Sequence, residues 1–314
     1  MQPDEKRLIK GIIINRFRGD KALFETGVTW IERKTGIPVL GILPWLKEIF
    51  PPEDSLDLLE MKQLNKCADI EIAIVKLPRI SNFSDLDPFW GDSSIQMRWI
   101  EPGEDIGTPD VLIIPGSKQT IKDLESLKIT GMSTQINNFA KSGGNIFGIC
   151  GGLQMLGKSL EDPHKQESIN DLSSFSYKGM NLLPIKTIFG ESKHNSQREE
   201  IVLWPQEESV KGFEMHYGKS DLIENQNFNI ISLFNNSSLG WVLEKKDQSF
   251  IGGTYLHGIF ENDEWRRQWI NKIRQKKGLK DLNPNEETNH EKRERLLDLL
   301  ADSFEKYINI EKII

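Results

Sequence analysis

Blocks of apolar and polar residues alternate along this chain and predict strands and helices in turn. Continuous apolar runs, which are typical of strands buried on both faces of a sheet, lie at residues 8–15, 37–43, 70–75, 111–115 and 145–149. Amphipathic stretches with helical spacing lie at residues 21–34, 119–127 and 132–141. Because strands and helices take turns over residues 70–160, the pattern predicts a parallel α/β sheet.

The pattern changes after residue 160. Short alternating segments, which predict antiparallel strands or hairpins, lie at residues 182–188, 200–204, 212–216, 230–234 and 239–243. One more strand is expected at residues 250–256, and helices are expected at residues 55–65, 263–276 and 291–308. Turn-forming residues dominate residues 78–88, so this stretch is predicted to be a loop.

The stretch at residues 145–157 carries the strongest chemical signal. Its apolar run stops at Cys150, two glycines follow, and a helical pattern begins at Leu153. A strand, a sharp turn and a helix in this order form a nucleophile elbow, here with cysteine as the nucleophile. The positive end of the following helix favours a thiolate, and its N–H groups can stabilise an oxyanion. The alternative is a buried cysteine that acts only as a small apolar side chain.

A histidine elsewhere in the chain favours the catalytic interpretation. His257 stands at the end of another apolar strand and is followed by Gly258. A cysteine and a distant histidine, each at a strand end, make a thiol nucleophile with its base.

Composition narrows the class of protein. The 314 residues are enough for one large or two ordinary domains. The net charge of −7 argues against nucleic-acid binding and gives no basic face for a membrane. The chain has two cysteines, Cys67 and Cys150, which are too few for a disulfide framework. This low number favours the reducing cytoplasm as the compartment. No signal peptide or apolar membrane span is evident in the sequence. No cluster has the spacing of metal ligands, so no metal site is expected.

Four motifs together resemble one family. They read Phe-Gly-Ile-Cys-Gly-Gly-Leu-Gln-Met-Leu-Gly at 147–157, Gly-Thr-Tyr-Leu-His-Gly-Ile-Phe at 253–260, Gly-Phe-Glu-Met-His-Tyr-Gly at 212–218 and Ile-Asn-Arg-Phe-Arg-Gly-Asp at 14–20. With the Pro-Gly-Ser loop at residues 115–117, they closely resemble the cobyric acid synthase family, a cobalamin-pathway branch of the class I glutamine amidotransferases. The resemblance covers essentially the whole chain in the right order.

The resemblance implies an α/β fold: a flavodoxin-like class I glutamine amidotransferase domain, preceded by the tail of a dethiobiotin-synthetase-like α/β domain. The implied boundaries are 1–62 for the remnant of the ATP-dependent domain, 69–262 for the amidotransferase domain and 263–314 for a C-terminal helical segment. The family's reaction amidates carboxylates b, d, e and g of adenosylcobyrinic acid a,c-diamide. Glutamine is the amide donor, ATP and Mg²⁺ are co-substrates, and no tightly bound cofactor is implied.

The chain departs from the family at one motif, because no Gly-x-x-x-x-Gly-Lys-Ser/Thr phosphate loop occurs in it. We therefore expect a fragment, a split-gene product or a chain begun at an internal methionine, which supplies the glutaminase part and does not use ATP alone. The expected partners are glutamine, a corrinoid substrate and, if the ATP half is encoded apart, a separate ATP-domain polypeptide.

The resemblance also implies roles for single residues. The Cys150 thiolate would attack the side-chain amide of glutamine, and His257 would accept the thiol proton and then protonate the leaving ammonia. The backbone N–H groups of Gly116 and Gly151 are candidates for the oxyanion hole.

Several positions keep two interpretations. Gln154 either lines the glutamine pocket or is an ordinary helix residue. Asn15 either contacts adenine, as its counterpart does in related ATP domains, or caps a turn. Glu214 and His216 share one face of a strand, where they either face the site or form a buried hydrogen-bonded pair.

The residue that orients His257 is left open by the sequence. The usual triad has a carboxylate two residues after the histidine, and that position here is Ile259. The cobalamin branch commonly lacks this acid. Glu261 is near in sequence and is a weak candidate.

Other functions stay open beside the favoured one. The chain could be another glutamine amidotransferase, such as cobyrinic acid a,c-diamide synthase or the glutaminase subunit of a cell-wall amidating ligase. It could instead be a non-catalytic remnant that binds a partner, or a cysteine hydrolase built on the same elbow.

Overall fold

The computed structural model describes residues 7–46, 68–90, 92–167, 175–223, 229–236, 238–283 and 288–310. The chain divides into two compact units, one of Met1–Glu53 with Glu287–Ile314 and one of Asp54–Glu286. Cys67 and the helix expected at residues 55–65 lie outside the described residues.

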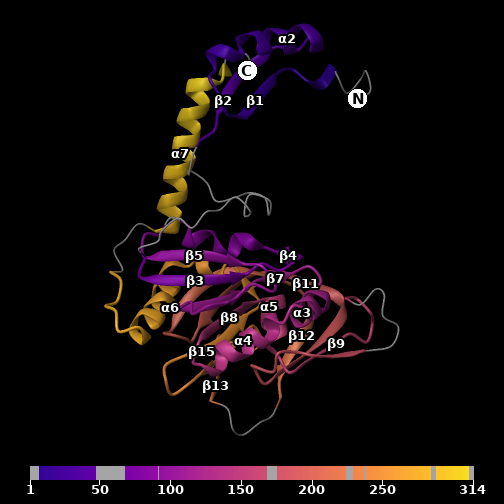
Figure 1. The fold of residues 1–314 in the computed structure, drawn as a ribbon, viewed down its shortest axis with the longest axis vertical. Helices are drawn as coiled ribbons and strands as arrows, with labels where there is room; N and C mark the ends of the chain where they lie inside the picture. Colours follow the sequence, from indigo (N-terminus) through magenta and orange to yellow (C-terminus); the bar gives the residue numbers. More distant parts are fainter. Residues whose placement is uncertain are drawn as a thin grey trace. The chain divides into compact units, whose positions relative to one another are not determined.

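A seven-stranded sheet forms the centre of the larger unit (Figure 1). Its strands, in spatial order, are β13 (Ile230–Ser232), β14 (Gly240–Glu244), β15 (Phe250–Thr254), β8 (Asn145–Ile149), β6 (Val111–Ile114), β3 (Ile70–Val75) and β5 (Ile95–Ile100). The five strands from β15 to β5 are parallel, and β14 is antiparallel to both of its neighbours. The predicted parallel α/β sheet is confirmed, and buried apolar side chains fill these strands because both faces are covered.

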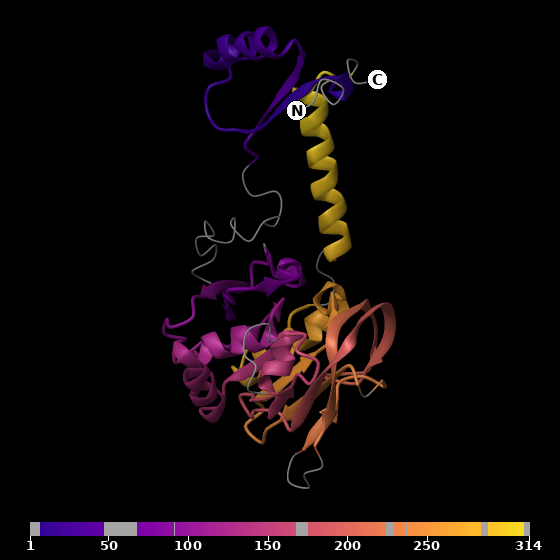
Figure 2. The ribbon, with the colours of Figure 1, turned by 90° about the vertical axis from the view of Figure 1, so that its right-hand side faces the viewer.

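Helices and a second sheet cover this central sheet. The helices of the larger unit are α3 (Thr120–Ile129), α4 (Met132–Lys141), α5 (Gly151–Leu156) and α6 (Asp263–Lys276). Figure 2 shows α3 and α4, in magenta, on the side of this unit away from the long salmon strands of the second sheet. An aromatic cluster packs α6 against the sheet and comprises Phe89, Phe147, Phe250, Phe260, Trp265 and Trp269.

The second sheet has five strands. Their order is β10 (Ser176–Lys178), β9 (Ser159–Glu161), β11 (Ile185–Val202), β12 (Glu208–Leu222) and β16 (Leu256–His257). The separate strands predicted at 182–188 and 200–204 are wrong, because β11 runs through both of them. The middle residues of β11 are exposed and polar on both faces, so they lack the apolar alternation by which a strand is recognised in a sequence. They form a strand because β11 pairs with β12.

The loop predicted at residues 78–88 is also wrong. Residues of this stretch form β4 (Ile80–Ser81), which pairs with β7 (Gly116–Ser117), and the 3₁₀-helix η3 (Phe83–Phe89). Turn-forming residues are abundant here, but Leu86 and Phe89 are buried. Packing of these two side chains therefore decides the conformation.

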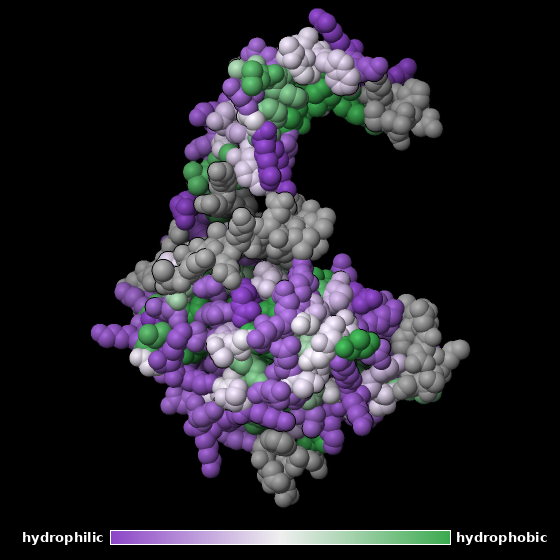
Figure 3. Space-filling model, viewed as in Figure 1, coloured by the Kyte–Doolittle hydropathy of each residue, from purple (hydrophilic) through white to green (hydrophobic). Residues whose placement is uncertain are grey.

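The smaller unit is a parallel pair of strands with helices. Its elements are β1 (Ile12–Phe17), the 3₁₀-helix η1 (Ala22–Phe24), α2 (Glu25–Thr35), β2 (Val39–Pro44) and α7 (Asn289–Tyr307). Leu40, Leu43 and Ile308 form its small core. Figure 3 shows green, apolar surface on this unit. Among its large apolar side chains, Leu23 and Trp30 are exposed.

The last two helices belong to different units. Helix α6 lies in the larger unit and α7 lies in the smaller one, although the sequence analysis placed both in one segment at 263–314. The expected limits 1–62 and 69–262 stay predictions. In the described part of the chain, no helix is long and apolar enough to cross a membrane.

Candidate active site

Cys150 stands on a tight turn between β8 and α5. Its backbone has φ 51° and ψ −107°, a strained conformation for a residue with a side chain. A Cβ on Gly152 would lie 2.0 Å from the carbonyl oxygen of Ile114, so only glycine fits there. The Cys150 N–H donates to Thr254 O at 2.7 Å and ties the turn to β15. The predicted strand–turn–helix layout is thus present.

His257 ends β16 and is fully buried. Its Nδ1 lies 2.7 Å from Oδ2 of Asp85, and the other oxygen of that carboxylate accepts the N–H of Gly258 at 2.8 Å. Asp85 belongs to η3 and lies 172 positions before the histidine. Nothing in the sequence marks Asp85 as a partner of His257, because residues 78–88 have the pattern of a loop of turn formers.

Two side chains cover the faces of the His257 ring. Phe213 stacks on the ring with centroids 5.1 Å apart and an interplanar angle of 20°. Nδ2 of Asn82 lies 3.3 Å from Nδ1 and 3.1 Å from Nε2, nearly equidistant from both. An atom in that position lies above the ring plane rather than in line with one nitrogen. The ring is therefore held between Phe213 and Asn82.

The charge state of His257 follows from its neighbours. Burial is the largest influence on its pKa and acts to lower it, but the hydrogen bonds to Asp85 and Cys150 and the charges of both groups raise the pKa to about 10. Since Asp85 occupies Nδ1, the Nε2 edge is left for Cys150. The structure thus brings the two predicted reactive residues together, with the histidine held as an imidazolium at neutral pH.

The loop after β6 brings a backbone N–H to the elbow. In the β4–β7 pair, Ser81 lies opposite Gly116, and the N–H of Lys118 donates to Arg79 O at 2.8 Å. Hydrogen-bonded pairs alternate in an antiparallel ladder, so the Gly116 N–H faces β4 and the N–H of Ser117 points the other way.

Since the N–H of Gly116 faces β4, Ser117 takes the place of Gly116 beside Gly151 as an oxyanion candidate. Its backbone nitrogen lies 3.0 Å from the position that a Cβ on Gly151 would take. The buried carboxylate of Asp123 fixes this loop, because it accepts the Ser117 Oγ–H at 2.6 Å and an Arg79 side-chain N–H at 3.1 Å.

Gln154 is buried and fully bonded within the protein. Its Oε1 accepts the hydroxyl of Thr120 at 3.2 Å, and its Nε2 donates to Tyr217 O at 3.0 Å and to the Tyr255 hydroxyl at 3.1 Å. These bonds join α5 to α3 and β12. Gln154 thus shapes the wall behind Cys150 through its contacts.

Glu214 and His216 form a buried hydrogen-bonded pair, one of the two predicted alternatives. Oε1 of Glu214 lies 2.9 Å from Nε2 of His216, and Arg198 binds the other oxygen through two nitrogens at 2.8 and 2.6 Å. Burial opposes ionisation of Glu214, but the bonds from Arg198 and His216 hold its pKa below the usual range. The pair fixes β12 where Met215 O lies 3.7 Å from Cys150 Sγ.

Glu167 is a buried acid that the sequence gave no means of finding. Burial raises its pKa to about 7, while the N–H groups of Ile121 and Thr120 act against that rise and the charges of Asp162 and Asp123 add to it. Its Oε2 has no hydrogen-bond partner among the described residues. Glu167 is therefore a further acid–base group with a strongly shifted pKa, and it lies against the first residues of α3.

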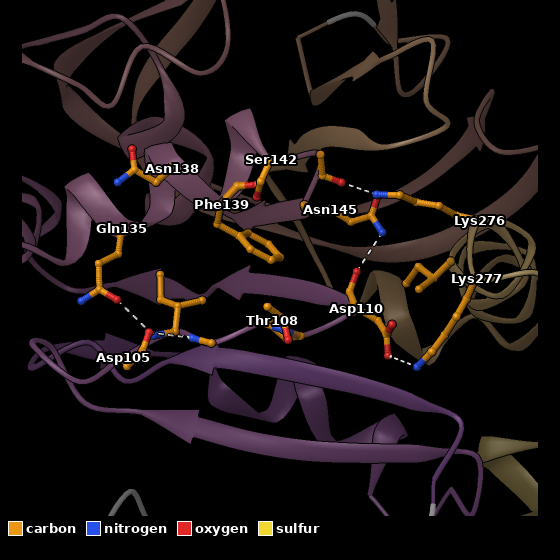
Figure 4. Close-up of a pocket in the computed structure, with 16 residues that line it drawn as sticks. Asp105, Thr108, Asp110, Gln135, Asn138, Phe139, Ser142, Asn145, Lys276 and Lys277 are labelled. Carbon is orange, nitrogen blue, oxygen red and sulfur yellow. Dashed lines mark hydrogen bonds and ion pairs between the residues drawn. The ribbon is translucent and has the colours of Figure 1, made fainter.

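A cavity of about 780 Å³ lies elsewhere, at the amino ends of β6 and β8 (Figure 4). Cys150 follows the carboxyl end of β8, so the cavity is at the opposite edge of the sheet. Its polar groups bond within the protein: Lys277 pairs with Asp110 at 2.8 Å, Lys276 donates to Gly143 O, and Asn145 donates to Asp110 O at 2.8 Å. The two lysines that line the cavity are therefore already bonded within the protein.

Asn15 lies in the smaller unit, at the end of β1. Its Oδ1 accepts the N–H of the next residue, Arg16, at 2.8 Å, and Arg16 has φ 54°. This geometry is that of a local turn cap, one of the two predicted roles. Among the residues that the structure describes, no group of three or more His, Cys, Asp or Glu side chains is placed to hold a metal ion.

Comparison with known proteins decides the family. The sequence profile of the CobB/CobQ-like glutamine amidotransferase domain matches residues 71–265, which is more than half of the chain. The chain belongs to this amidotransferase family. The class of enzyme expected from Cys150, His257 and their motifs is thereby confirmed, and so is the class I amidotransferase-like α/β fold.

Relatives of this amidotransferase are longer proteins. Cobyric acid synthase of Prochlorococcus marinus strain NATL1A is 80% identical over 314 residues, which cover 100% of this chain and 64% of the relative. Cobyric acid synthase of strain MIT 9313 is 51% identical over 316 residues and is covered to 63%. That of Synechococcus sp. strain WH7803 is 47% identical over 319 residues and is covered to 64%. The chain thus spans a little under two thirds of these relatives.

Solved structures of amidotransferases are more distant from this chain. One glutamine amidotransferase is 13% identical, with a TM-score of 0.46, and the match covers 66% of this chain and 99% of that one. A glutamine amidotransferase from Thermotoga maritima is 14% identical, with a TM-score of 0.42, over 76% of this chain and 97% of that one.

Proposed function

We propose that this chain supplies the glutaminase part of a cobyric acid synthase. It would release ammonia from glutamine for the amidation of carboxylates b, d, e and g of adenosylcobyrinic acid a,c-diamide. The observation that carries the proposal is the pairing of Cys150, on a strained elbow, with the imidazolium of His257. The names of the relatives support the corrinoid substrate.

The geometry supports a thiolate mechanism. The Cys150 thiolate attacks the amide carbon of glutamine, and the N–H groups of Ser117 and Gly151 receive the developing oxyanion. His257 gives its Nε2 proton to the leaving nitrogen, so that ammonia departs and a glutamyl thioester forms. The neutral His257 then takes a proton from water, which attacks the thioester and releases glutamate.

We assign the ATP-dependent step to the part of the longer relatives that this chain does not cover. The chain contains no Gly-x-x-x-x-Gly-Lys-Ser/Thr phosphate loop, so we assign no phosphate or Mg²⁺ contact to its own residues. We propose that residues 1–62, which include β1 and β2, are the tail of the dethiobiotin-synthetase-like domain. The relatives hold their extra length in one polypeptide, so they do not support a separate ATP-domain partner.

Ammonia release from glutamine tests this proposal. The purified chain should release ammonia and glutamate in equal amounts, and Cys150→Ala should abolish the release. A glutamine-analogue alkylating agent should label Cys150 in the wild type. A chain that neither releases ammonia nor takes the label, also after addition of the missing part of a full-length relative, would instead be the non-catalytic remnant.

A further inference from the structure

The geometry points to Asp85 as the positioning residue that orients His257 and holds its proton, so that the acid of the catalytic group comes from η3 and not from the segment after the histidine. This inference rests on the proposed glutaminase function. It answers the question that Ile259, an apolar residue at the usual position of the acid, leaves open.

Both oxygens of Asp85 are engaged at the end of β16. One lies 2.7 Å from Nδ1 of His257 and the other accepts the Gly258 N–H at 2.8 Å. A carboxylate only accepts hydrogen bonds, so Nδ1 must carry a proton. The ring is thereby fixed in the one tautomer whose Nε2 can take a proton from Cys150 and give it to the leaving nitrogen.

The position of Asp85 is set by packing. In the same 3₁₀-helix, Phe89 packs against Phe260 with ring centroids 4.6 Å apart, and against Trp269 at 5.9 Å. Leu86 is buried as well. Because buried Leu86 and Phe89 anchor η3 directly after the carboxylate, Asp85 is in place before any substrate binds.

The electrostatics of the site agree with this role. Asp85 is 4% exposed, and a buried carboxylate is costly unless a cation or several donors compensate it. The titratable groups that face His257 are Asp85 and Cys150, while Asn82 and Phe213 cover the ring faces without charge. Glu261, the acid that is near His257 in sequence, is exposed. It is not the partner of Nδ1, because Asp85 occupies that nitrogen.

The variant Asp85→Asn tests the inference with little change of shape. The amide oxygen can still accept the Gly258 N–H, but the NH₂ group then faces Nδ1 and favours the tautomer protonated at Nε2. We expect kcat for glutamine hydrolysis to fall on the order of 10³- to 10⁴-fold, the scale of a wrong tautomer in a related triad. KM should be unchanged, because Asp85 faces the ring and not the substrate.

A second readout follows the thiolate without using glutamine. In a Cys67→Ser background, iodoacetamide should alkylate Cys150 readily at pH 6, because His257 is an imidazolium below its pKa of about 10 and a neighbouring cation favours a reactive cysteine. Asp85→Asn should lower the rate at pH 6 by about 10- to 100-fold and recover it at pH 9. Asp92→Asn is the matched control, since Asp92 caps Ser94 nearby and should leave the profile unchanged.

The outcomes separate two failures. If a folded Asp85→Asn variant keeps the wild-type pH profile of alkylation and the wild-type kcat, Asp85 has only a structural role. This result would overturn the inference and leave the proposed function standing. A wild-type Cys150 that reacts only as an ordinary thiol, above about pH 8, would overturn the proposed function and the inference together. If the variant does not fold, nitrogen-15 spectra of the histidines in the wild-type protein test the inference instead. The inference requires that Nδ1 of His257 keeps its proton from pH 6 to 9, and loss of this proton would overturn it.

Discussion

At the scale of single residues, the elbow depends on missing side chains. The φ of Cys150 is positive, and the adjacent helix starts so close to β6 that no Cβ fits at Gly152. The contact that a Cβ would make is with the backbone oxygen of Ile114, which cannot move without distorting the sheet. The strain at the nucleophile is thus kept by the packing around it.

Gly152→Ala should destabilise the larger unit and abolish glutamine hydrolysis. We expect the free energy of unfolding to fall by about 3 kcal/mol or more, because overpacking against backbone has no relaxed alternative. Urea unfolding and ammonia release measure the two effects. Gly190→Ala is the control, since nothing lies within 4 Å of its Cβ position. Equal effects of the two variants would contradict the steric argument.

Glu167 should make stability depend on pH near neutrality. Its pKa rises from 4.5 to about 7 on folding, mainly through burial, so the folded state binds this proton more tightly than the unfolded state. The sign follows: the free energy of unfolding falls as pH rises from about 4.5 to 7, by up to about 3 kcal/mol. Glu167→Gln should remove this slope in urea unfolding at pH 5 and pH 8. Glu161→Gln, which removes an exposed pair with Lys186, should keep the slope.

At the scale of elements, the apolar runs of β3, β6 and β8 predicted parallel strands because these runs are buried on both faces. The run at residues 8–15 also forms a parallel strand, but the expected burial is wrong, because β1 buries no residue fully and Ile13 is 38% exposed. The same rule failed for β11, whose middle residues are exposed on both faces and are held as a strand only by β12. Cys150 and His257 could be paired from sequence because each follows an apolar run, although Cys150 follows β8 of the central sheet and His257 ends β16 of the second sheet. Asp85 could not be, because its place depends on Phe89 packing against residues of η4 (Ile259–Glu261) and α6.

Helix α6 should contribute to stability mainly through Trp269. This fully buried ring contacts Phe89, Phe147 and Phe260 at centroid distances of 5.9, 5.8 and 5.0 Å. Trp269→Ala should lower the free energy of unfolding by about 3–5 kcal/mol, because it leaves a large cavity. It should also slow glutamine hydrolysis, because Phe89 anchors η3. Trp30→Ala, the same change on the exposed face of α2, should cost less than about 0.5 kcal/mol in the same titration.

At the scale of the whole molecule, the two units differ in the size of their cores. Strands β3, β6 and β8 lie in one large apolar cluster, whereas the buried cluster described in the smaller unit consists of Leu40, Leu43 and Ile308. Helices α2 and α7 bury no residue fully in the described structure. The free energy of local opening scales with such burial, so the units should open independently.

Amide hydrogen exchange should therefore show different opening rates for the smaller and the larger unit. Amides of β1 and β2 should exchange at least ~100-fold faster than those of β3, β6 and β8, because opening the smaller unit exposes far less apolar surface. Leu40→Ala should speed exchange further in β2, where it removes one of three core side chains, and should leave β8 at its wild-type rate. If β8 accelerates as much as β2, the two units unfold as one cooperative body. The glutaminase site would then depend on β1 and β2 for its stability, although none of its residues lies there.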